Sequence, residues 1–322
     1  HPDYTAAEYT ETVLVFKGMM NWSNKSLNNS IRKAYVPITN DATFGKIYGD
    51  ANICFDAAGQ VGYMSVMGYN QSIAPGKVIH PILSMSVNGG NSWLPVFGPN
   101  LDLLVDNLTG DSLKDIFADI TGWTIGHISS AARGHDLVVD ALGRPHMLLN
   151  LFPGTGTIPT GGSSAGGFAT YPSINLMVDL YYSNGTWKCN VISQVSNMTY
   201  DYDQTNGPVS ENNRPQISMS PDRHWLFYSW FESDSAYWSS NQAPDWHVSV
   251  YDAIGDSIFN RYSRLTNDGG NHWANVAEWA FDEGDDQYSL HMTYGNVSSV
   301  SSVNVLSPIT HSYKKAMLTV VT

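Results

Sequence analysis

The sequence predicts an all-β fold from its composition, its short alternating apolar segments and a repeated hairpin pattern. Aromatic residues make up 12% of the 322 residues, and charged residues only 14%, against about 25% in an average soluble protein. The apolar residues occur in short runs broken by Gly, Asn and Asp, as in strands joined by tight turns. We expect one domain over residues 1–322, because all-β domains often reach this length.

Four segments share an apolar strand, a turn that begins with Asp or Ser, and a second strand. They begin at Asn52, Asp136, Gln216 and Glu278, and their turns begin at Asp56, Asp140, Ser220 and Asp282. A second β pair follows each hairpin, at 80–87, 174–182, 246–251 and 315–321. Two hairpins per unit predict the four-stranded antiparallel blade of a β-propeller. We expect five or six blades, closed into a ring by pairing of residues 12–16 with the strand at 316–321.

Helical periodicity is scarce, and one short helix is expected over residues 111–120. It falls in a segment from about 97 to 133 that interrupts the strand pattern. We interpret this segment as an insertion in the propeller.

Two octapeptides carry a family resemblance: Ser86-Val-Asn-Gly-Gly-Asn-Ser-Trp93 and Thr266-Asn-Asp-Gly-Gly-Asn-His-Trp273. They resemble the Asp-box, or BNR repeat, of sialidase-like β-propellers. In such a turn the acidic or amide side chain accepts backbone N–H groups, glycine supplies positive φ, and the Trp packs between sheets. We therefore expect structural roles, with both Trp side chains buried, for Ser86, Asn88, Gly90, Trp93, Thr266, Asp268, Gly270 and Trp273.

The sequences of the predicted hairpins also resemble those of secreted or surface propellers of Bacteroidota. Such proteins are often exported by the type IX secretion system. This resemblance covers the chain from about 49 to 322 as a pattern. It implies an extracellular or cell-surface location. The start at His1 rather than Met fits a processed protein or a piece of a longer one.

The formal net charge is −13, with only 16 Lys plus Arg. Such a surface repels nucleic acid and anionic membranes, so we expect neither as a partner. No apolar run reaches the roughly 18 residues of a membrane helix, so no membrane insertion is expected. A protein or a glycan at the cell surface is the expected partner, because many aromatic and few charged residues suit such recognition.

The sequence assigns no catalytic residue. The Arg-Ile-Pro signature of sialidases is missing, and no Gly-x-Ser-x-Gly elbow, P-loop or His-Glu-x-x-His is present. A non-catalytic binding or structural propeller is the favoured interpretation. A sialidase-like glycoside hydrolase is the alternative, because two carboxylates in one pocket would suffice for such an enzyme.

No cofactor and no metal ligand are predicted, with one open alternative. The acidic run from Asp282 to Asp286 is interpreted as a solvated turn, but clustered carboxylates also suit Ca²⁺. Cys54 and Cys189 both lie in segments with the residue pattern of a β-strand, 135 positions apart. We interpret them as two buried small side chains, with a disulfide as the alternative.

The candidate binding site follows from aligning the four hairpins on their turns. The innermost strand of a propeller blade starts at the mouth of the central channel, where ligands usually bind. The polar residues at these strand starts are Asp50, Asn52, His135, Asp136, Arg214, Gln216 and Glu278. Either they are polar only because strand ends meet water, or they converge on one pocket in which Arg214 holds an anionic group.

Overall fold

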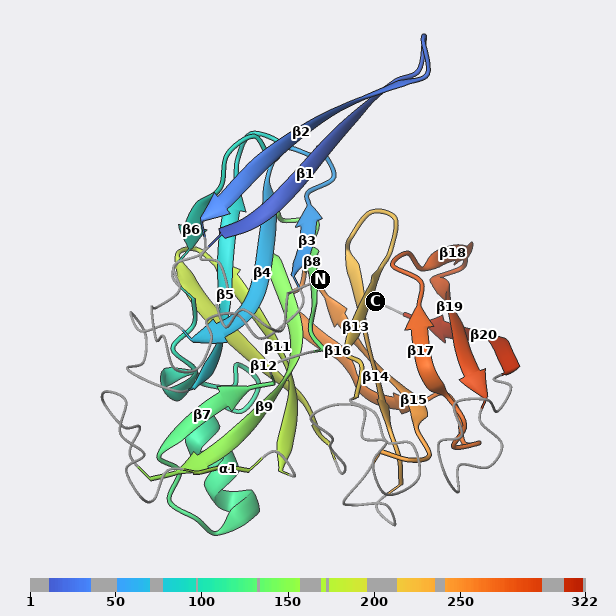
Figure 1. Cartoon of the computed structure of the whole chain (residues 1–322). Coiled ribbons are helices and arrows are strands. Elements are labelled where there is room, and N and C mark those ends of the chain that lie inside the picture. The colour runs from blue at the N-terminus through green and yellow to red at the C-terminus, as the bar shows by residue number, and fades with distance from the viewer. Residues whose placement is uncertain are drawn as a thin grey trace.

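The structure is a computed structural model (Figure 1). It describes residues 12–35, 51–69, 78–96, 98–131, 134–156, 169–171, 174–195, 213–234, 241–296 and 310–320.

The described residues form a β-propeller of antiparallel sheets, as the sequence predicts. Sheet 1 contains β3 (Asn52–Phe55), β4 (Gly62–Tyr69), β5 (Ile79–Ser86) and β6 (Leu94–Val96), in that order. Sheet 3 contains β13 (Gln216–Met219), β14 (Trp225–Glu232), β15 (Asp245–Asp252) and β16 (Ser257–Arg264). In both sheets each strand pairs with the next one along the chain, which is the meander of a propeller blade.

Sheets 2 and 4 have an inner edge made of two short strands. Sheet 2 contains β7 (His127–Ser130), β8 (Asp136–Val139), β9 (Pro145–Thr155), β10 (Ala169–Thr170), β11 (Asn175–Ser183) and β12 (Thr186–Val195), with β7 and β8 both paired to β9. Sheet 4 contains β17 (His272–Val276), β18 (Phe281–Gly284), β19 (Gln287–Asn296) and β20 (Thr310–Thr319), with β17, β18 and β20 all paired to β19. The four predicted hairpins are therefore β3–β4, β8–β9, β13–β14 and β18–β19. The fourth turn lies at Asp285 and Asp286 rather than at Asp282, which belongs to β18.

The sheets pack face to face because their strands alternate in side-chain direction. On β14, Trp225, Phe227 and Phe231 belong to the core shared with sheet 4. Leu226, Tyr228 and Trp230 point the other way, into the core that joins sheets 1, 2 and 3. Each central sheet is thus buried on both faces, which explains the apolar and aromatic content of the strands.

The expected helix is present as α1 (Leu113–Thr121) and follows the short helix η1 (Leu101–Leu103). Ser112 caps α1 by accepting a hydrogen bond from the Asp115 backbone N–H, and Gly122 ends it at φ 72°. The expected insertion also contains β7, which pairs with β9. Its last part therefore belongs to sheet 2 rather than to an added loop.

The N-terminal strand does not close the ring as expected. β1 (Thr12–Asn21) pairs with β2 (Ser26–Tyr35) in a separate two-stranded hairpin, and β20 pairs with β19. The hairpin projects beside sheet 1 (Figure 1). The expected five or six blades are not confirmed, because the described residues form four sheets of this kind and this hairpin. The local turn between β1 and β2 brings their ends together at a much lower loop-closure entropy than a pairing across about 300 residues.

Candidate functional site

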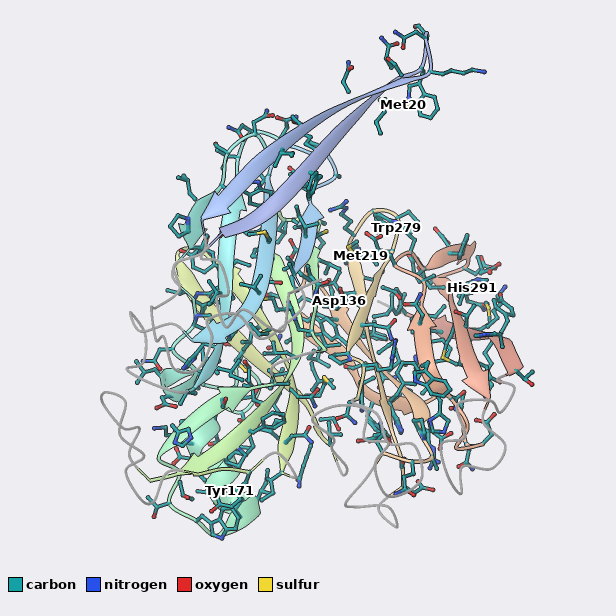
Figure 2. The ribbon with its side chains drawn as sticks, in the orientation of Figure 1. Met20, Asp136, Tyr171, Met219, Trp279 and His291 are labelled. Atoms are coloured by element: carbon teal, nitrogen blue, oxygen red, sulfur yellow. The ribbon has the colours of Figure 1, made fainter. Side chains whose placement is uncertain are left out.

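A polar pocket lies where the inner strands of all four sheets meet. Its volume is about 460 Å³. Sheet 1 contributes residues 52–54, sheet 2 contributes residues 134–138, sheet 3 contributes residues 214–217, and sheet 4 contributes Asn275, Val276 and Glu278. Figure 2 shows Asp136 at the centre of the molecule, between the sheets. Six of the seven predicted site residues line this pocket, and Asp50 lies outside the described residues.

His135 is a buried, neutral side chain at the wall of the pocket. Its backbone carbonyl accepts a hydrogen bond from Asn52 Nδ2 at 2.7 Å, and its Nε2 lies 2.8 Å from Ser65 Oγ. Burial lowers the pKa of His135 to about 4. Its Nδ1 has no hydrogen-bond partner among the described residues, although buried polar atoms are usually paired.

Asp136 is held by backbone groups of two sheets. Its Oδ1 accepts the N–H of Leu137, and its Oδ2 accepts the N–H of Ile217 in sheet 3, both at 2.8 Å. Burial raises the pKa of Asp136 to about 6, and the negative charge of Glu278 acts in the same direction. The two backbone hydrogen bonds oppose this shift, because they stabilise the ionised form.

Arg214 stands at the mouth of the pocket in a left-handed backbone conformation, with φ 44°. The equivalent position of sheet 2, two residues before the inner strand, is Gly134 with φ 73°. An arginine in this conformation costs about 1 kcal/mol more than a glycine. The Arg214 Nε donates to the Ala274 carbonyl oxygen at 3.0 Å, which fixes the side chain against sheet 4.

The polar residues that begin the inner strands also join neighbouring sheets. Asn52 reaches sheet 2 and Asp136 reaches sheet 3, as described above. Gln216 reaches sheet 4, where its Oε1 accepts the Val276 N–H at 2.8 Å. Glu278 lies three residues before β18 rather than at the start of that strand, and its side chain is exposed at the pocket. Asn52, Asp136 and Gln216 thus join neighbouring sheets, and Glu278 lines the pocket with them.

At the far ends of the inner strands β3 and β8, Arg223 joins sheets 1, 2 and 3. Its Nη1 donates to the carbonyl oxygens of Phe55 in sheet 1 and Val139 in sheet 2, at 2.5 and 3.0 Å. Its guanidinium carbon lies 5.5 Å from the centre of the Trp279 ring. Cys54, on β3, is a buried free thiol whose pKa is raised by burial. Cys189 is also free and buried, so the two cysteines do not form a disulfide.

A second polar cluster, centred on His146, lies in the core between sheets 2 and 3. His146 is fully buried and lies 3.2 Å from Asp140 and 3.1 Å from Asp179. Burial lowers the His146 pKa, but the two carboxylates outweigh this and raise it to about 9. Tyr228 Oη donates to Asp179 at 2.8 Å. No local sequence pattern indicates this cluster, because its members lie on three strands and in one turn.

The two Asp-box segments differ in how their turns are held. In the first, Asn88 Oδ1 accepts the Ser92 N–H at 2.9 Å, Ser86 Oγ accepts the Gly90 N–H at 2.9 Å, and Trp93 is buried. In the second, the N–H groups of Asp268 and Gly269 donate to the buried Asp245, at 2.9 and 3.0 Å.

Asp268 itself bonds Lys314 at 2.6 Å. Positive φ falls on Gly269 rather than on Gly270, and Trp273 is only half-buried. The expected burial of Trp273 is therefore wrong. Asp268 Oδ1 accepts Asn271 Nδ2 at 2.9 Å within the turn, but the backbone N–H groups of Asp268 and Gly269 donate to Asp245 instead. A carboxylate 23 residues upstream of Asp268 holds the turn.

Among the described residues, no group of three or more His, Cys, Asp or Glu side chains is arranged to hold a metal ion. No helix of the described part of the chain is long and apolar enough to cross a membrane. A calcium ion at residues 282–286 stays a prediction.

No protein-family model matches the chain, and no curated protein sequence matches it. Several solved structures resemble it distantly. One is a protein of unknown function from Dyadobacter fermentans, at 10% identity and TM-score 0.42, covering 94% of this chain and 66% of that one. Another is the GH93 α-L-arabinofuranosidase of Fusarium graminearum, at 10% identity and TM-score 0.39, covering 84% and 62%.

A third is the GH43 endo-arabinanase of Bacillus licheniformis, at 13% identity and TM-score 0.32, covering 84% and 72%. This chain therefore spans slightly less than two-thirds of the length of the first two. Likenesses this distant say nothing about activity, and the fold assignment depends on the sheets themselves.

Proposed function

We propose that this protein is a secreted or cell-surface β-propeller of the Asp-box kind that binds a glycan in its central pocket without cleaving it. The observation that carries the proposal is the convergence of polar groups from four sheets on one cavity of about 460 Å³. Ligand pockets usually have volumes of roughly 300–1,000 Å³ and a few well-placed polar groups.

The polar groups suit a ligand rich in hydroxyl groups. The pocket offers an acceptor at Glu278, a cation at Arg214 and the amide side chains of Asn52 and Gln216. A sugar hydroxyl both donates and accepts, so it can satisfy neighbouring groups of different kinds. Arg214 also suits an acidic group on the glycan, because a guanidinium binds carboxylates and sulfates well.

The hydrogen bonds of Asp136 are the reason to propose that the bound glycan is not cleaved. Both of its carboxylate oxygens accept backbone N–H groups. A general acid or a nucleophile needs an oxygen that faces the substrate, so Asp136 is better placed to hold sheets 2 and 3 together.

A glycoside hydrolase is the second candidate, and a specific observation favours it. Asp136 has a pKa raised to about 6 and shares the pocket with Glu278. Two carboxyl groups in one pocket, one of them with a raised pKa, are what such enzymes use.

The first experiment measures binding and turnover on the same glycan panel. Isothermal titration calorimetry gives affinities, and a reducing-sugar assay detects cleavage. Glu278→Gln keeps the shape of an exposed side chain, so we expect it to fold normally and to weaken binding about tenfold. Asp119→Asn, on the exposed face of α1, is the matched control and should leave binding unchanged.

The outcomes separate the candidates. Binding without sugar release supports the proposal, whereas release that is lost in Glu278→Gln supports the hydrolase. A folded protein that binds no member of a broad panel, acidic glycans included, contradicts both.

A further inference from the structure

The β1–β2 hairpin has one apolar face that the rest of the described chain leaves exposed. Phe16 pairs with Ile31 across the hairpin, and Met20 pairs with Leu27. These four side chains lie on the same face, because they are separated by even numbers of residues along each strand. They are 70%, 58%, 42% and 57% exposed, in that order. Figure 2 shows Met20 near the projecting end of the hairpin.

The opposite face of the hairpin fixes its base to sheet 1. Val15 packs against the cluster of Met64, Val66, Ile82 and Trp93. Lys17 Nζ donates to the Gly89 carbonyl at 2.8 Å and to Asn91 Oδ1 at 3.1 Å. The hairpin is thus held at one end, and its far end projects beyond the body of the molecule (Figure 1). Another molecule can reach this end.

Sheet 4 presents a second exposed apolar face. Leu290, Met292 and Tyr294 of β19 face the core shared with sheet 3, so Ser289 and His291 face away from it. The strand register places Phe281 and Met317 beside Ser289 on this outer face. Phe281 is 55% exposed, Met317 48% and Tyr313 59%. The His291 ring contacts Phe281 and Tyr313, and Ser289 is fully buried on this face. Among the described residues, Phe281, Met317 and Tyr313 nevertheless stay about half exposed, whereas the equivalent faces of sheets 2 and 3 are buried.

Charge distinguishes the two faces. Residues 12–35 contain Lys17, Lys25, Arg32 and Lys33 and no acidic residue, although the whole chain has a net charge of −13. In sheet 4, Asp282 and Glu283 belong to β18, and Asp285 and Asp286 form the turn to β19. Lys315, which lies beside His291 on the outer face, pairs with Glu283 at 2.6 Å. All four of these acidic residues are exposed. The hairpin as a whole is therefore basic, although Lys17 lies on the face opposite Phe16, and the β18–β19 end of sheet 4 keeps an excess of negative charge after the Lys315–Glu283 pair. A basic hairpin and an acidic sheet end on one chain are complementary between two copies of that chain.

We propose that the hairpin of one molecule docks, through Phe16, Met20, Leu27 and Ile31, on the outer face of sheet 4 of a second copy. Two molecules that exchange hairpins in this way form a reciprocal dimer with two equal contacts. Each contact covers an apolar sheet face, as the neighbouring sheets do within the molecule. The hairpin takes the place that a further sheet would have beside sheet 4.

The test measures self-association of the whole chain by sedimentation velocity across the micromolar range. We expect the wild type to form dimers that weaken as salt rises, because the two surfaces attract each other through exposed charges. The hairpin variant Phe16→Ser/Met20→Ser and the sheet variant Phe281→Ser/Met317→Ser should each associate at least about tenfold more weakly. Leu142→Ser is the control, because Leu142 is 57% exposed in a turn away from both surfaces.

Mixing the two variants gives the decisive result. The hairpin variant keeps an intact sheet 4, and the sheet variant keeps an intact hairpin, so the mixture should form a one-to-one dimer that neither variant forms alone. Far-ultraviolet circular dichroism and melting temperatures confirm that both variants fold. The proposal is overturned by a wild type that stays monomeric, by undiminished association of either variant, or by folded variants that do not associate on mixing. Capture of the monomeric wild type by anionic lipid vesicles also counts against it.

Discussion

Arg223 Nη1 donates to the carbonyl oxygen of Phe55, 168 positions earlier in the chain, at a distance of 2.5 Å. This bond joins sheet 3 to sheet 1 across the central channel. Arg223 has φ 61°, at the turn position where the other hairpins have Gly59 and Gly143. The contacts of the Arg223 side chain therefore offset the backbone strain of an arginine at this position.

Arg223→Ala should destabilise the protein by about 1–3 kcal/mol, because the carbonyls of Phe55 and Val139 lose their charged donor. Arg223→Gly loses the same bonds but relieves the left-handed strain, so it should cost about 1 kcal/mol less than Arg223→Ala. Urea unfolding of both variants measures the difference. Equal stability of the wild type and Arg223→Ala would contradict a role of this side chain in joining the sheets.

The buried His146 should make stability depend on alkaline pH. Its pKa of about 9 in the folded protein lies above its ordinary value of 6.5, so the folded state binds the proton more tightly. This contribution to the free energy of unfolding is fully present below about pH 6.5. It is lost as the pH rises through 9.

His146→Gln should remove this alkaline slope. It should also cost about 3–5 kcal/mol at neutral pH, since Asp140 and Asp179 lose their shared positive partner in the core. Urea titrations at a series of alkaline pH values check both effects. A wild-type slope that persists unchanged in His146→Gln would assign the pH dependence to other groups.

The two Asp-box tryptophans should differ in their effect on stability. Trp93 is buried against Phe55, with ring centres 6.0 Å apart, so Trp93→Ala should cost about 3–5 kcal/mol. Trp273 is half-buried, so Trp273→Ala should cost clearly less. Melting temperatures of the two variants test this order, and a larger loss for Trp273→Ala would reverse it.

The turn of the second Asp-box should depend on Asp245 rather than on Asp268. Asp245 is buried, accepts the hydroxyl of Thr266 and the N–H groups of Asp268 and Gly269, and pairs with Arg264. Asp245→Ala should therefore cost about 3 kcal/mol. Asp268→Ala removes an exposed pair with Lys314 and one hydrogen bond from Asn271, and should cost only about 1 kcal/mol. Chemical denaturation of both variants checks the contrast.

The local features of the fold were predictable because local sequence determines them. The turn after Asp140 shows this: Asp140 Oδ1 accepts the N–H groups of Leu142 and Arg144, and Gly143 has positive φ. Hairpins of this kind are visible in the sequence. Their alignment also brought Asp136, Arg214 and Glu278 to one pocket, since equivalent strand starts meet at the same end of a propeller.

Features that depend on contacts between distant segments were not predictable. No local pattern links Asp245 to the turn at 266–271, or Asp179 to His146. The pairing of β1 with β2 was also missed, because the sequence of a strand does not by itself specify its partner strand. Two strands joined by a short turn pair more readily than two ends of the chain.

Asp136 should make the stability of the ligand-free protein depend on mildly acidic pH. Its pKa of about 6 lies above its ordinary value of 3.8, so the folded state holds the proton longer than the unfolded state. The contribution of this proton to stability is fully present below about pH 4 and is lost as the pH rises through 6. Asp136→Asn has no proton to lose, so its stability should not fall in this interval. Glu278→Gln removes a nearby negative charge that raises the Asp136 pKa, so the fall should move to lower pH. Urea midpoints measured between about pH 4.5 and 7.5 show both effects. Parallel curves for the wild type and Asp136→Asn would mean that Asp136 does not titrate in this interval.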